Sequence, residues 1–269
     1  MRILSIDSSL GTQVTALDAD PARDGGALEV LAAAGQDSPR AHAESLGPML
    51  AQVLGDPRVA DRPLDAVVAA TGPAPFTGLR AGLVAARTVG RARSLPVHGI
   101  PSLDAVARLA LDRLDAGLGV GPGAQQDGGQ EAGSTPVVLV ATDARRGEVY
   151  AARYRARGAD DVERLDPLSV LPPAQAWELG PFDLVAGSGL ALHPELGRAP
   201  AGAPGDGGAR DGAAGDGGAL AGPVLVSGDA LAQVRLALAR LARGEQLSTE
   251  PIYLRHADVQ MPSSRKRVS

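Results

Sequence analysis

The residues that most constrain the fold follow an apolar segment ending at Ala70. Residues 71–83 read Thr-Gly-Pro-Ala-Pro-Phe-Thr-Gly-Leu-Arg-Ala-Gly-Leu and lead from a predicted strand, Leu64–Ala70, into a predicted helix, Gly78–Arg93. Every fourth residue of this helix is small, so four small residues share one face: Gly78, Gly82, Ala86 and Gly90. A face without side-chain bulk lets another backbone approach closely, at a cost of about 1 kcal/mol of helix propensity per Gly relative to Ala. The face packs either on the chain's own sheet or on a partner, and the spacing alone leaves both open.

Four further blocks accompany this motif. They are Ile-Leu-Ser-Ile-Asp-Ser-Ser at residues 3–9, His-Ala-Glu-Ser-Leu-Gly-Pro at 42–48, Asp-Ala-Arg-Arg-Gly-Glu-Val-Tyr at 143–150 and Pro-Ile-Tyr-Leu-Arg at 251–255. Together with Gly-Pro-x-x-Phe-Thr-Gly-Leu-Arg, they resemble the TsaB family, also called YeaZ. Its members are subunits of the bacterial machinery that makes threonylcarbamoyladenosine in tRNA. The resemblance covers most of the chain outside two Gly-rich tracts, and it departs at Ala74, where the family usually has Gly.

The resemblance implies an α/β fold with two domains, the actin-like ATPase (ribonuclease H-like) fold, with mixed sheets flanked by helices. The sequence pattern agrees, because strands open as a meander and then alternate with helices, which favours a mixed sheet covered by helices. The predicted strands of the first domain, 1–115, are Arg2–Asp7, Thr12–Leu17, Leu28–Ala34, Leu64–Ala70 and Pro96–Gly99. Its predicted helices are Arg40–Leu54, with Pro48 as a kink, Gly78–Arg93 and Ser102–Leu114.

Two tracts rich in Gly, Ala, Asp and Pro, 116–135 and 198–223, are predicted to be disordered inserts, since they bury too little apolar surface to offset chain entropy. A second, smaller domain is predicted at 136–226, followed by a C-terminal helix and tail at 227–269. Its predicted strands are Val137–Thr142, Glu148–Arg155, Asp183–Ala186 and Val224–Val226. The helix at Ala230–Arg243 is expected to return to the first domain, as the resemblance implies.

The composition excludes several common types of catalytic site. The 269 residues include no Cys, so a thiolate nucleophile and a thiolate metal site are excluded. Lys266 is the only lysine and lies in the tail, which excludes a P-loop. The four histidines are far apart and no pair has helical ligand spacing, and no Gly-x-Ser-x-Gly elbow occurs.

Charge and hydropathy point to a cytoplasmic protein that does not associate with membranes. The net charge of −5 gives no general basic footprint for nucleic acid, and the one basic cluster, Arg265-Lys266-Arg267, reads as a solvated tail. No apolar run approaches the roughly 20 residues needed to cross a bilayer. The chain starts on a predicted strand instead of a signal peptide.

In active proteins of the actin-like fold, the first hairpin carries an acidic residue for magnesium and donors for phosphate. The matching residues here are Asp7, Ser8 and Ser9, which offer a carboxylate and hydroxyl groups. They either contact a nucleotide or simply close a turn. The second hairpin has Arg145 and Arg146 where active relatives keep small residues, which favours the turn-closing interpretation. These arginines could still pair with phosphate or with a partner's carboxylate, but they do not form an open glycine cradle.

The catalytic relatives of the same pathway, the TsaD type, bind iron or zinc through a His-x-x-x-His pair. At the matching place this chain has Ser102 and Val106, which cannot supply that metal site. We expect Ser102 to cap the helix that begins there. No metal is therefore expected, and no cofactor: ATP and metal would belong to partner subunits.

The resemblance implies that helices 40–54 and 78–93 pack on a TsaD-type transferase, or on a second copy in a homodimer. The predicted contact residues are His42, Leu46, Met49, Leu50, Phe76, Thr77, Gly78, Leu79, Gly82 and Ala86. We hypothesise that Gly82 and Ala86 permit close helix crossing at that interface. A TsaE-type small ATPase and, through the complex, tRNA are the other implied partners.

The sequence thus favours a noncatalytic scaffold subunit that binds and activates a TsaD-type threonylcarbamoyltransferase. Three rivals stay open. An independent actin-fold ATPase or small-molecule kinase would use Asp7 and Ser9 with the hairpin at Asp143–Gly147. A metallopeptidase is disfavoured by Ser102 and Val106, and a self-associating structural protein would share the homodimer without the tRNA role.

Overall fold

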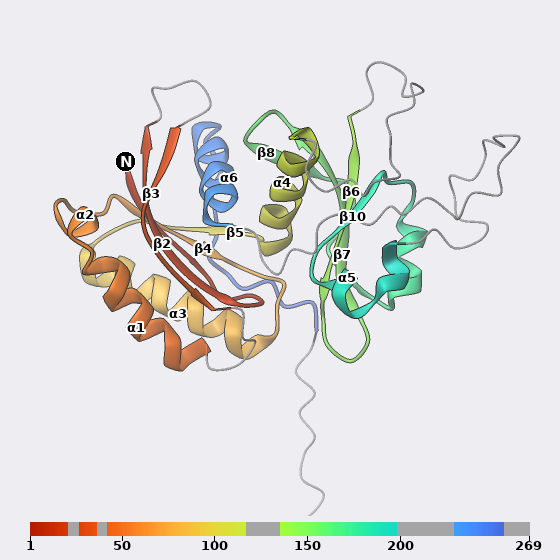
Figure 1. The fold of residues 1–269 in the computed structure, drawn as a ribbon, viewed down its shortest axis with the longest axis horizontal. Helices are drawn as coiled ribbons and strands as arrows, with labels where there is room; N and C mark the ends of the chain where they lie inside the picture. Colours follow the sequence, from red (N-terminus) through yellow and green to blue (C-terminus); the bar gives the residue numbers. More distant parts are fainter. Residues whose placement is uncertain (21–26, 37–41, 117–134, 198–228, 256–269) are drawn as a thin grey trace, which may run out of the picture.

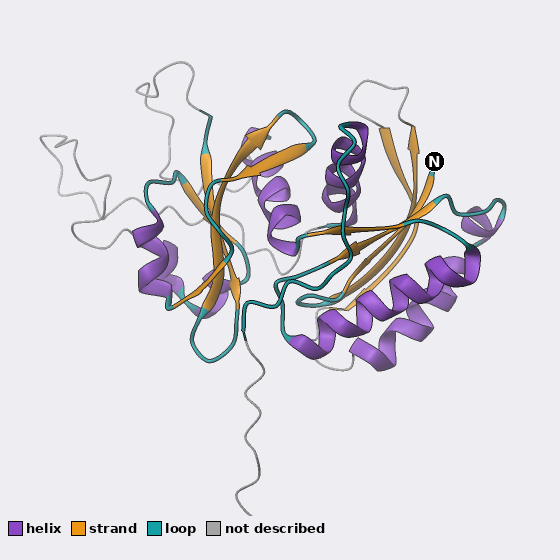
Figure 2. Cartoon of the chain, turned by 180° about the vertical axis from the view of Figure 1, so that it is seen from behind, coloured by secondary structure: helices purple, strands orange, loops and turns teal. Residues whose placement is uncertain are grey.

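The structure is a computed structural model that describes residues 1–20, 27–36, 42–116, 135–197 and 229–255. Two five-stranded sheets stand side by side, and two helices, α4 and α6, lie between them (Figure 1). Helices α1 and α3 cover the outer face of the first sheet, and shorter helices lie outside the second sheet (Figures 1 and 2). This arrangement confirms the predicted α/β fold with mixed sheets flanked by helices.

The first sheet has the strand order β3-β2-β1-β4-β5. Its strands are β1 (Arg2–Asp7), β2 (Thr12–Asp20), β3 (Ala27–Gln36), β4 (Ala66–Ala70) and β5 (Val97–Ile100). The first three pair antiparallel, whereas β4 and β5 continue the sheet parallel to β1. The central strand β1 is buried along its whole length because both faces of the sheet are covered.

Helices α1 (His42–Leu54) and α3 (Phe76–Arg93) lie side by side on this sheet, and the short α2 (Pro57–Ala60) follows α1. Their apolar faces share a core with alternate residues of the strands, including Leu4 and Ile6 of β1. Helix α1 continues through Pro48. Helix α3 begins two residues before the predicted Gly78, with Pro75 at its N-cap.

The second sheet has the order β10-β6-β7-β8, and β9 pairs with β7. Its strands are β6 (Val137–Asp143), β7 (Val149–Arg157), β8 (Asp161–Arg164), β9 (Ser169–Leu171) and β10 (Leu184–Ala186). The short helices beside it are η1 (Pro173–Leu179), α5 (Gly189–Leu192) and η2 (Pro194–Gly197). The sequence predicts the β6–β7 hairpin and β10, whereas β8, β9 and the short helices were not predicted.

The middle layer consists of α4 (Ser102–Asp115) and α6 (Ala230–Ala242). Helix α6 packs against β1, β4 and β5, which confirms the predicted return of the C-terminal helix to the first domain. Helix α4, assigned to the first domain from sequence, packs mainly against β6 and β7 of the second sheet. One hydrophobic core therefore joins both sheets through these helices and includes Ile3, Ile100, Leu103, Tyr154 and Val234.

A buried ionic cluster ties the middle layer to the second sheet. Asp104 of α4 pairs with Arg240 of α6 at 2.9 Å and accepts a hydrogen bond from the Tyr154 hydroxyl at 3.1 Å. Arg240 also pairs with Asp161 of β8 at 2.9 Å, and Arg243 pairs with the same carboxylate. Burial raises the pKa of Asp104, and the charges of Arg240 and Arg164 oppose that rise. The cluster joins α4 and α6 to the neighbouring strands β7 and β8.

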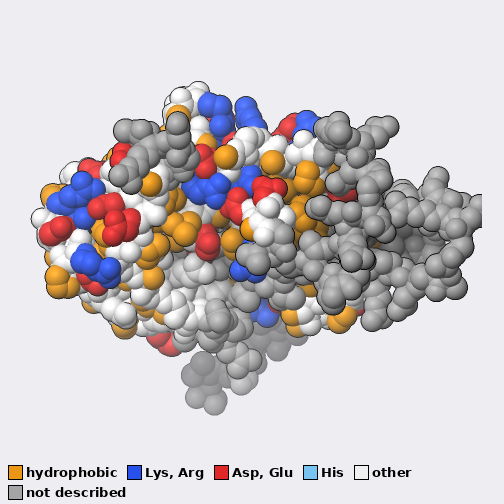
Figure 3. All heavy atoms as spheres, turned by 45° about the horizontal axis from the view of Figure 1, so that its top comes forward, with side chains coloured by type: hydrophobic (Ala, Val, Ile, Leu, Met, Phe, Trp, Pro, Cys, Tyr) orange, Lys and Arg blue, Asp and Glu red, His pale blue; other side chains and the backbone are white. Residues whose placement is uncertain are grey.

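The surface carries charges of both signs. On the face shown in Figure 3, acidic and basic side chains are intermixed with hydrophobic ones. The predicted inserts within 116–135 and 198–223, the predicted strand Val224–Val226 and the basic tail lie outside the described residues, apart from Ala116 and Thr135 at the edges of the first tract.

Candidate functional site

The glycine face of α3 points into the protein. Gly78, Gly82 and Ala86 are all buried. A Cβ added to Gly82 would fall far inside van der Waals contact with Ser8 Oγ, and one added to Gly78 would lie 2.6 Å from the Ser8 carbonyl oxygen. The hypothesis that Gly82 and Ala86 form a helix crossing with a partner is therefore wrong: the missing side chains make room for the chain's own β1–β2 turn.

The other predicted contact residues divide between the interior and the surface. His42 and Leu46 of α1 are buried, and so is Leu79 of α3. The His42 Nδ1 atom is 2.8 Å from Thr12 Oγ1, so this histidine ties α1 to β2. Because these three residues are buried, they cannot form a docking surface in this conformation, contrary to the prediction. Among the rest, Met49, Leu50 and Phe76 are half-buried and Thr77 is exposed.

The solvent-facing side of α1 and α3 carries charged residues, among them Glu44, Arg80 and Arg87, and exposed uncharged residues lie beside them. We call these uncharged residues the outer helix face: Ala43, Gly47, Pro48 and Ala51 of α1 with Thr77, Val84 and Thr88 of α3. Val84 has 64% of its surface exposed. A surface helix normally turns charged and polar residues to water. The residues of the outer helix face are mostly small or apolar, and the two helices that carry them run side by side (Figure 2).

The first predicted phosphate turn uses its own polar groups internally. Asp7 Oδ1 accepts hydrogen bonds from the Ser9 backbone N–H at 2.8 Å and from the Ser9 hydroxyl at 2.5 Å. The Ser8 hydroxyl donates to the Gly78 carbonyl oxygen at 2.7 Å. Burial raises the pKa of Asp7, and the hydrogen bonds from Ser9 oppose that rise. The turn is closed, as the turn-forming interpretation of these residues predicts.

The second predicted turn lies between β6 and β7. Arg145 and Arg146 are both exposed and adopt left-handed backbone conformations, with φ of 65° and 58°. Arg145 folds back on Asp143, with its N–H 2.7 Å from one carboxylate oxygen and its guanidinium 3.0 Å from the other. Arg255 reaches this turn from the C-terminal segment, where it pairs with Glu148 and donates to the Arg145 carbonyl oxygen at 3.3 Å.

Ser102 and Val106 are buried on α4. The prediction that Ser102 caps its own helix is wrong, since Pro101 occupies the N-cap. Ser102 Oγ instead accepts a hydrogen bond from the Gly72 N–H at 3.1 Å, and the Ser102 N–H donates to the Gly72 carbonyl oxygen at 2.7 Å. Ser102 therefore fixes the turn that precedes α3. In the described part of the chain, no three His, Asp or Glu side chains form a group that could hold a metal ion.

Sequence reasoning missed two features. The first is the role of the segment Leu247–Arg255, which lies along the first sheet and reaches the β6–β7 turn. Its Pro-Ile-Tyr-Leu-Arg block contributes to the family resemblance without indicating what the segment contacts. The second is a cavity of about 580 Å³ near the ends of α1 and α3. Its lining residues include Leu54, Val59, Asp61, Arg62 and Arg93.

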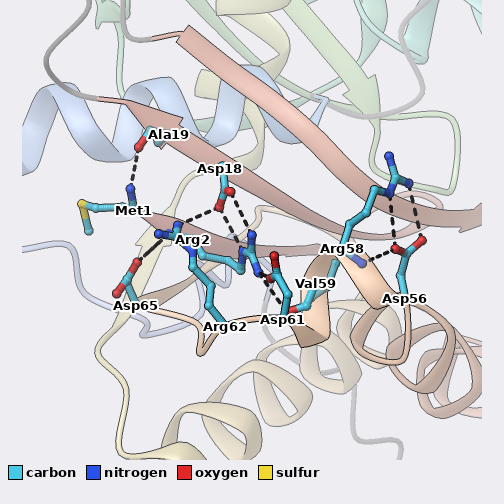
Figure 4. Close-up of polar contacts among 10 residues, drawn as sticks. All are labelled: Met1, Arg2, Asp18, Ala19, Asp56, Arg58, Val59, Asp61, Arg62 and Asp65. Atoms are coloured by element: carbon cyan, nitrogen blue, oxygen red, sulfur yellow. Dashed lines mark hydrogen bonds and ion pairs between the residues drawn. The ribbon is translucent and has the colours of Figure 1, made fainter.

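A cluster of charges beside this cavity anchors the start of the chain (Figure 4). The Arg2 guanidinium, 4% exposed, pairs with Asp18 at 2.9 Å and with Asp61, and donates to the Val59 carbonyl oxygen at 3.1 Å. Arg62 also pairs with Asp18 at 2.9 Å. The hydrogen bond from Arg2 holds the pKa of Asp18 below its usual range, against the effect of burial. The cluster connects β1, β2 and the segment after α2.

Comparisons with known proteins agree with this geometry. The sequence model of the tRNA N6-adenosine threonylcarbamoyltransferase (TsaD) family matches residues 35–120. An uncharacterized protein of Mycobacterium tuberculosis is 40% identical over 149 residues, 55% of this chain and 56% of the relative. The tRNA threonylcarbamoyladenosine biosynthesis protein TsaB of Escherichia coli is 27% identical over 164 residues, 60% of this chain and 63% of the relative. In these alignments the chain spans little more than half the length of the relatives.

Among solved structures, YeaZ from Pseudomonas aeruginosa superposes with a TM-score of 0.65 and 22% identity, covering 94% of this chain and 99% of YeaZ. The chain therefore shares the fold of YeaZ, as the predicted α/β fold with mixed sheets flanked by helices requires, and the chain's own contacts hold the β1–β2 and β6–β7 turns. The chain is thus similar in sequence to TsaB of Escherichia coli over part of its length and similar in fold to YeaZ of Pseudomonas aeruginosa. No helix in the described ranges is both long and apolar enough to span a bilayer.

Proposed function

We propose that the chain is a noncatalytic scaffold subunit of bacterial tRNA threonylcarbamoyladenosine synthesis. In this role it binds and activates a TsaD-type threonylcarbamoyltransferase through the outer helix face. Its similarity to TsaB of Escherichia coli and the match of residues 35–120 to the TsaD family model support a part in this pathway. A homodimer would use the same face when the partner is absent. The transferase and a TsaE-type ATPase would carry out the chemistry, and they would bind the ATP and the metal. The tRNA substrate would be held through the complex.

The observation that carries the proposal is the composition of the outer helix face. An apolar side chain as exposed as Val84 is stabilised when a partner removes it from water, at roughly 25 cal/mol per Å² buried. The small residues beside it, such as Gly47 and Ala51 of α1, allow another helix to lie close. A patch of this kind on adjacent helices is typical of a protein–protein contact surface.

Two features support a role without catalysis. Asp7, the matching acidic residue of the first turn, is buried and engaged by Ser9, and its raised pKa opposes the charged form that a magnesium ligand needs. Ser102, at one of the two positions that hold metal-binding histidines in TsaD-type enzymes, engages Gly72, and Val106 at the other has no ligand atom.

The test is size-exclusion chromatography with light scattering, on the chain alone and mixed with the TsaD-type protein of the same organism. We expect a stable heterodimer that forms at the expense of any homodimer. Val84→Arg should weaken it at least about ten-fold, since an arginine in the centre of an apolar contact is buried without a partner. Leu192→Arg is the matched control, because Leu192 is 58% exposed on α5 of the second domain.

The two variants separate the possible results. Heterodimer formation that Val84→Arg leaves intact would contradict docking through the outer helix face. A chain that ignores its TsaD-type protein at micromolar concentration would contradict the scaffold role altogether. Thermal unfolding of each variant is the folding control. If a variant unfolds as cooperatively as the wild type, its loss of binding comes from the changed surface and not from a loss of the fold.

A further inference from the structure

The C-terminal segment Leu247–Arg255, which we call the strap, follows one edge of the first sheet. The Gly99 N–H of β5 donates to the Leu247 carbonyl oxygen at 3.1 Å, and the Ile252 N–H donates to the Thr71 carbonyl oxygen, just after β4, at 2.8 Å. A Cβ at Gly99 would fall far inside van der Waals contact with the Ser248 carbonyl oxygen, so the glycine permits this close approach. The strap thus lies over the carboxyl ends of β4 and β5.

Helix α3 holds the strap from one side. Arg87 donates to the Thr249 carbonyl oxygen at 2.7 Å. Arg80 donates to the Tyr253 hydroxyl at 2.9 Å, and the Tyr253 ring lies 4.9 Å from the Phe76 ring. The Arg80 guanidinium is also 5.2 Å from the Tyr253 ring centroid, within the range of a cation–π contact. These contacts use both the backbone and the side chains of the strap.

The last residue of the strap crosses to the second domain. Arg255 pairs with Glu148 and donates to the Arg145 carbonyl oxygen, both in the β6–β7 turn. The strap therefore runs from the carboxyl edge of the first sheet to the second predicted phosphate turn. Figure 1 shows the strap passing from the first sheet toward the second.

The covered edge is the one where parallel α/β sheets bind ligands. Strands β1 and β4 run parallel with Ile6 opposite Ala69, so Asp7 and Ala70 end at the same edge. Ligands of such sheets lie outside the carboxyl ends of the strands. Arginines lie on both sides of that edge, Arg80 on α3 and Arg145 on the β6–β7 turn, where Arg145 is paired with Asp143. Positive charge on both sides suits an anionic ligand such as the polyphosphate of a nucleotide.

We propose that the strap is an autoinhibitory element that closes this edge to polyphosphate ligands by occupying the backbone and arginine groups that would face them. Release of the strap frees Arg80 from Tyr253 and removes Arg255 from the β6–β7 turn. The edge then accepts the polyphosphate group of a nucleoside triphosphate. This inference concerns the isolated chain and stands whether or not the chain docks on a transferase.

The test measures binding of a fluorescent ATP analogue in the presence of magnesium, using the full chain. Tyr253→Ala with Arg255→Ala removes the side-chain contacts of the strap, and Ile252→Pro removes the backbone hydrogen bond to Thr71. Arg155→Ala is the matched control. It breaks the 2.8 Å ion pair between Arg155 and Glu163, which is not part of the strap or its contacts. Hydrogen exchange of residues 247–255 reports independently whether the strap is released.

We expect no saturable binding for the wild type and the Arg155 control. Both strap variants should exchange faster across 247–255 and bind at least about ten-fold more tightly, with displacement by inorganic tripolyphosphate. Equal binding by wild type and variants would overturn the proposal, as would released variants that bind nothing. A strap that stays protected in both variants would also overturn it, because the contacts described here would not be what holds it.

Discussion

The Ser8 hydroxyl donates a hydrogen bond to the Gly78 carbonyl oxygen across 2.7 Å and occupies the space beside Gly82 that a side chain would need. One contact thus explains two of the small residues of α3. The β1–β2 turn enters the groove that these glycines leave, so the close approach that their spacing predicts occurs within the chain.

Gly82→Ala should destabilise the fold by about 1–3 kcal/mol, the usual cost of adding a methyl group to a closely packed interior. The added carbon would displace Ser8 and break its hydrogen bond to Gly78. Urea unfolding of the wild type and the variant measures the difference. The double variant with Ser8→Ala should recover part of the loss, because it removes the oxygen nearest to the new methyl group.

Gly47→Ala is the matched control for that substitution. Gly47 is an exposed residue of α1, and a Cβ there would meet nothing within 4 Å. Because Ala has the higher helix propensity, this change should stabilise the protein by up to about 1 kcal/mol. Equal effects of the two substitutions would contradict the packing described for Gly82.

Arg240→Leu tests the ionic cluster of the middle layer. Asp104 and Asp161 are 6% and 1% exposed, so removing their shared partner leaves two carboxylates in a poorly solvated place. We expect a loss of about 3 kcal/mol in the free energy of unfolding. Addition of Asp104→Asn should recover part of it, since a neutral side chain still accepts the hydrogen bond from Tyr154.

The control for this cluster is Arg155→Leu, which breaks an exposed pair with Glu163. Exposed pairs of this kind contribute little because solvent and salt screen them. Its unfolding midpoint should match that of the wild type. If Arg240→Leu behaved in the same way, the cluster would not hold α6 to β8.

Arg2→Leu should show a stability loss that depends on pH. The folded-state pKa of Asp18 is held low chiefly by the hydrogen bond from Arg2, so the ionised carboxylate is stabilised in the fold. That contribution is present above the unfolded-state pKa of about 4 and is lost as the pH falls through the folded value. Urea unfolding should show a loss of about 1–3 kcal/mol at pH 7 and a smaller one at pH 3.

Arg58→Leu is the companion variant in the same region (Figure 4). Arg58 pairs with Asp56 at 3.3 Å, and the Arg58 side chain is 63% exposed. Its unfolding midpoint should stay unchanged at both pH values. A loss for Arg2→Leu that is as large at pH 3 as at pH 7 would mean that packing of the arginine stem, and not the carboxylate, is what matters.

The fold was predictable from sequence because its elements are local. Alternation and apolar runs locate β1 to β7 and β10 to within a few residues, and helical spacing locates α1, α3, α4 and α6. The direction of the α3 glycine face was not predictable, since spacing shows which residues share a face but not what lies opposite. Ser102 shows the same limit: a serine before a helix suggests a cap, but Pro101 takes that position and Ser102 meets Gly72.

The strap was harder to predict for a related reason. It forms no helix or strand, so it leaves no periodic signal, and its contacts reach back to Thr71, Gly99 and Glu148. Only long-range geometry shows that it covers the carboxyl edge of the first sheet. The hydrogen bond from Ser8 to Gly78 likewise joins residues far apart in the chain, so no local pattern specifies it.

Asp7→Asn tests whether the first turn is structural. Asp7 is buried, and burial raises its pKa in the folded state, so folding favours the protonated form. Because the folded-state pKa lies above the unfolded-state pKa of about 4, the free energy of unfolding decreases as the pH rises from the unfolded-state pKa through the folded-state pKa. Asparagine keeps the oxygen that accepts from the Ser9 N–H and hydroxyl but carries no charge. The variant should therefore melt at a higher temperature than the wild type at pH 7, and the difference should vanish below about pH 4.

The same substitution separates the scaffold from the rival ATPase. If Asp7 held magnesium for hydrolysis by this chain alone, Asp7→Asn would abolish an intrinsic, magnesium-dependent ATPase activity of the wild type. In the structural role, the variant keeps its binding to the TsaD-type protein and only its melting temperature changes. Ser9→Ala is the control, because losing the hydroxyl that donates to Asp7 should lower stability by about 1 kcal/mol. A destabilised Asp7→Asn variant at neutral pH would show that the fold requires the charge on this carboxylate.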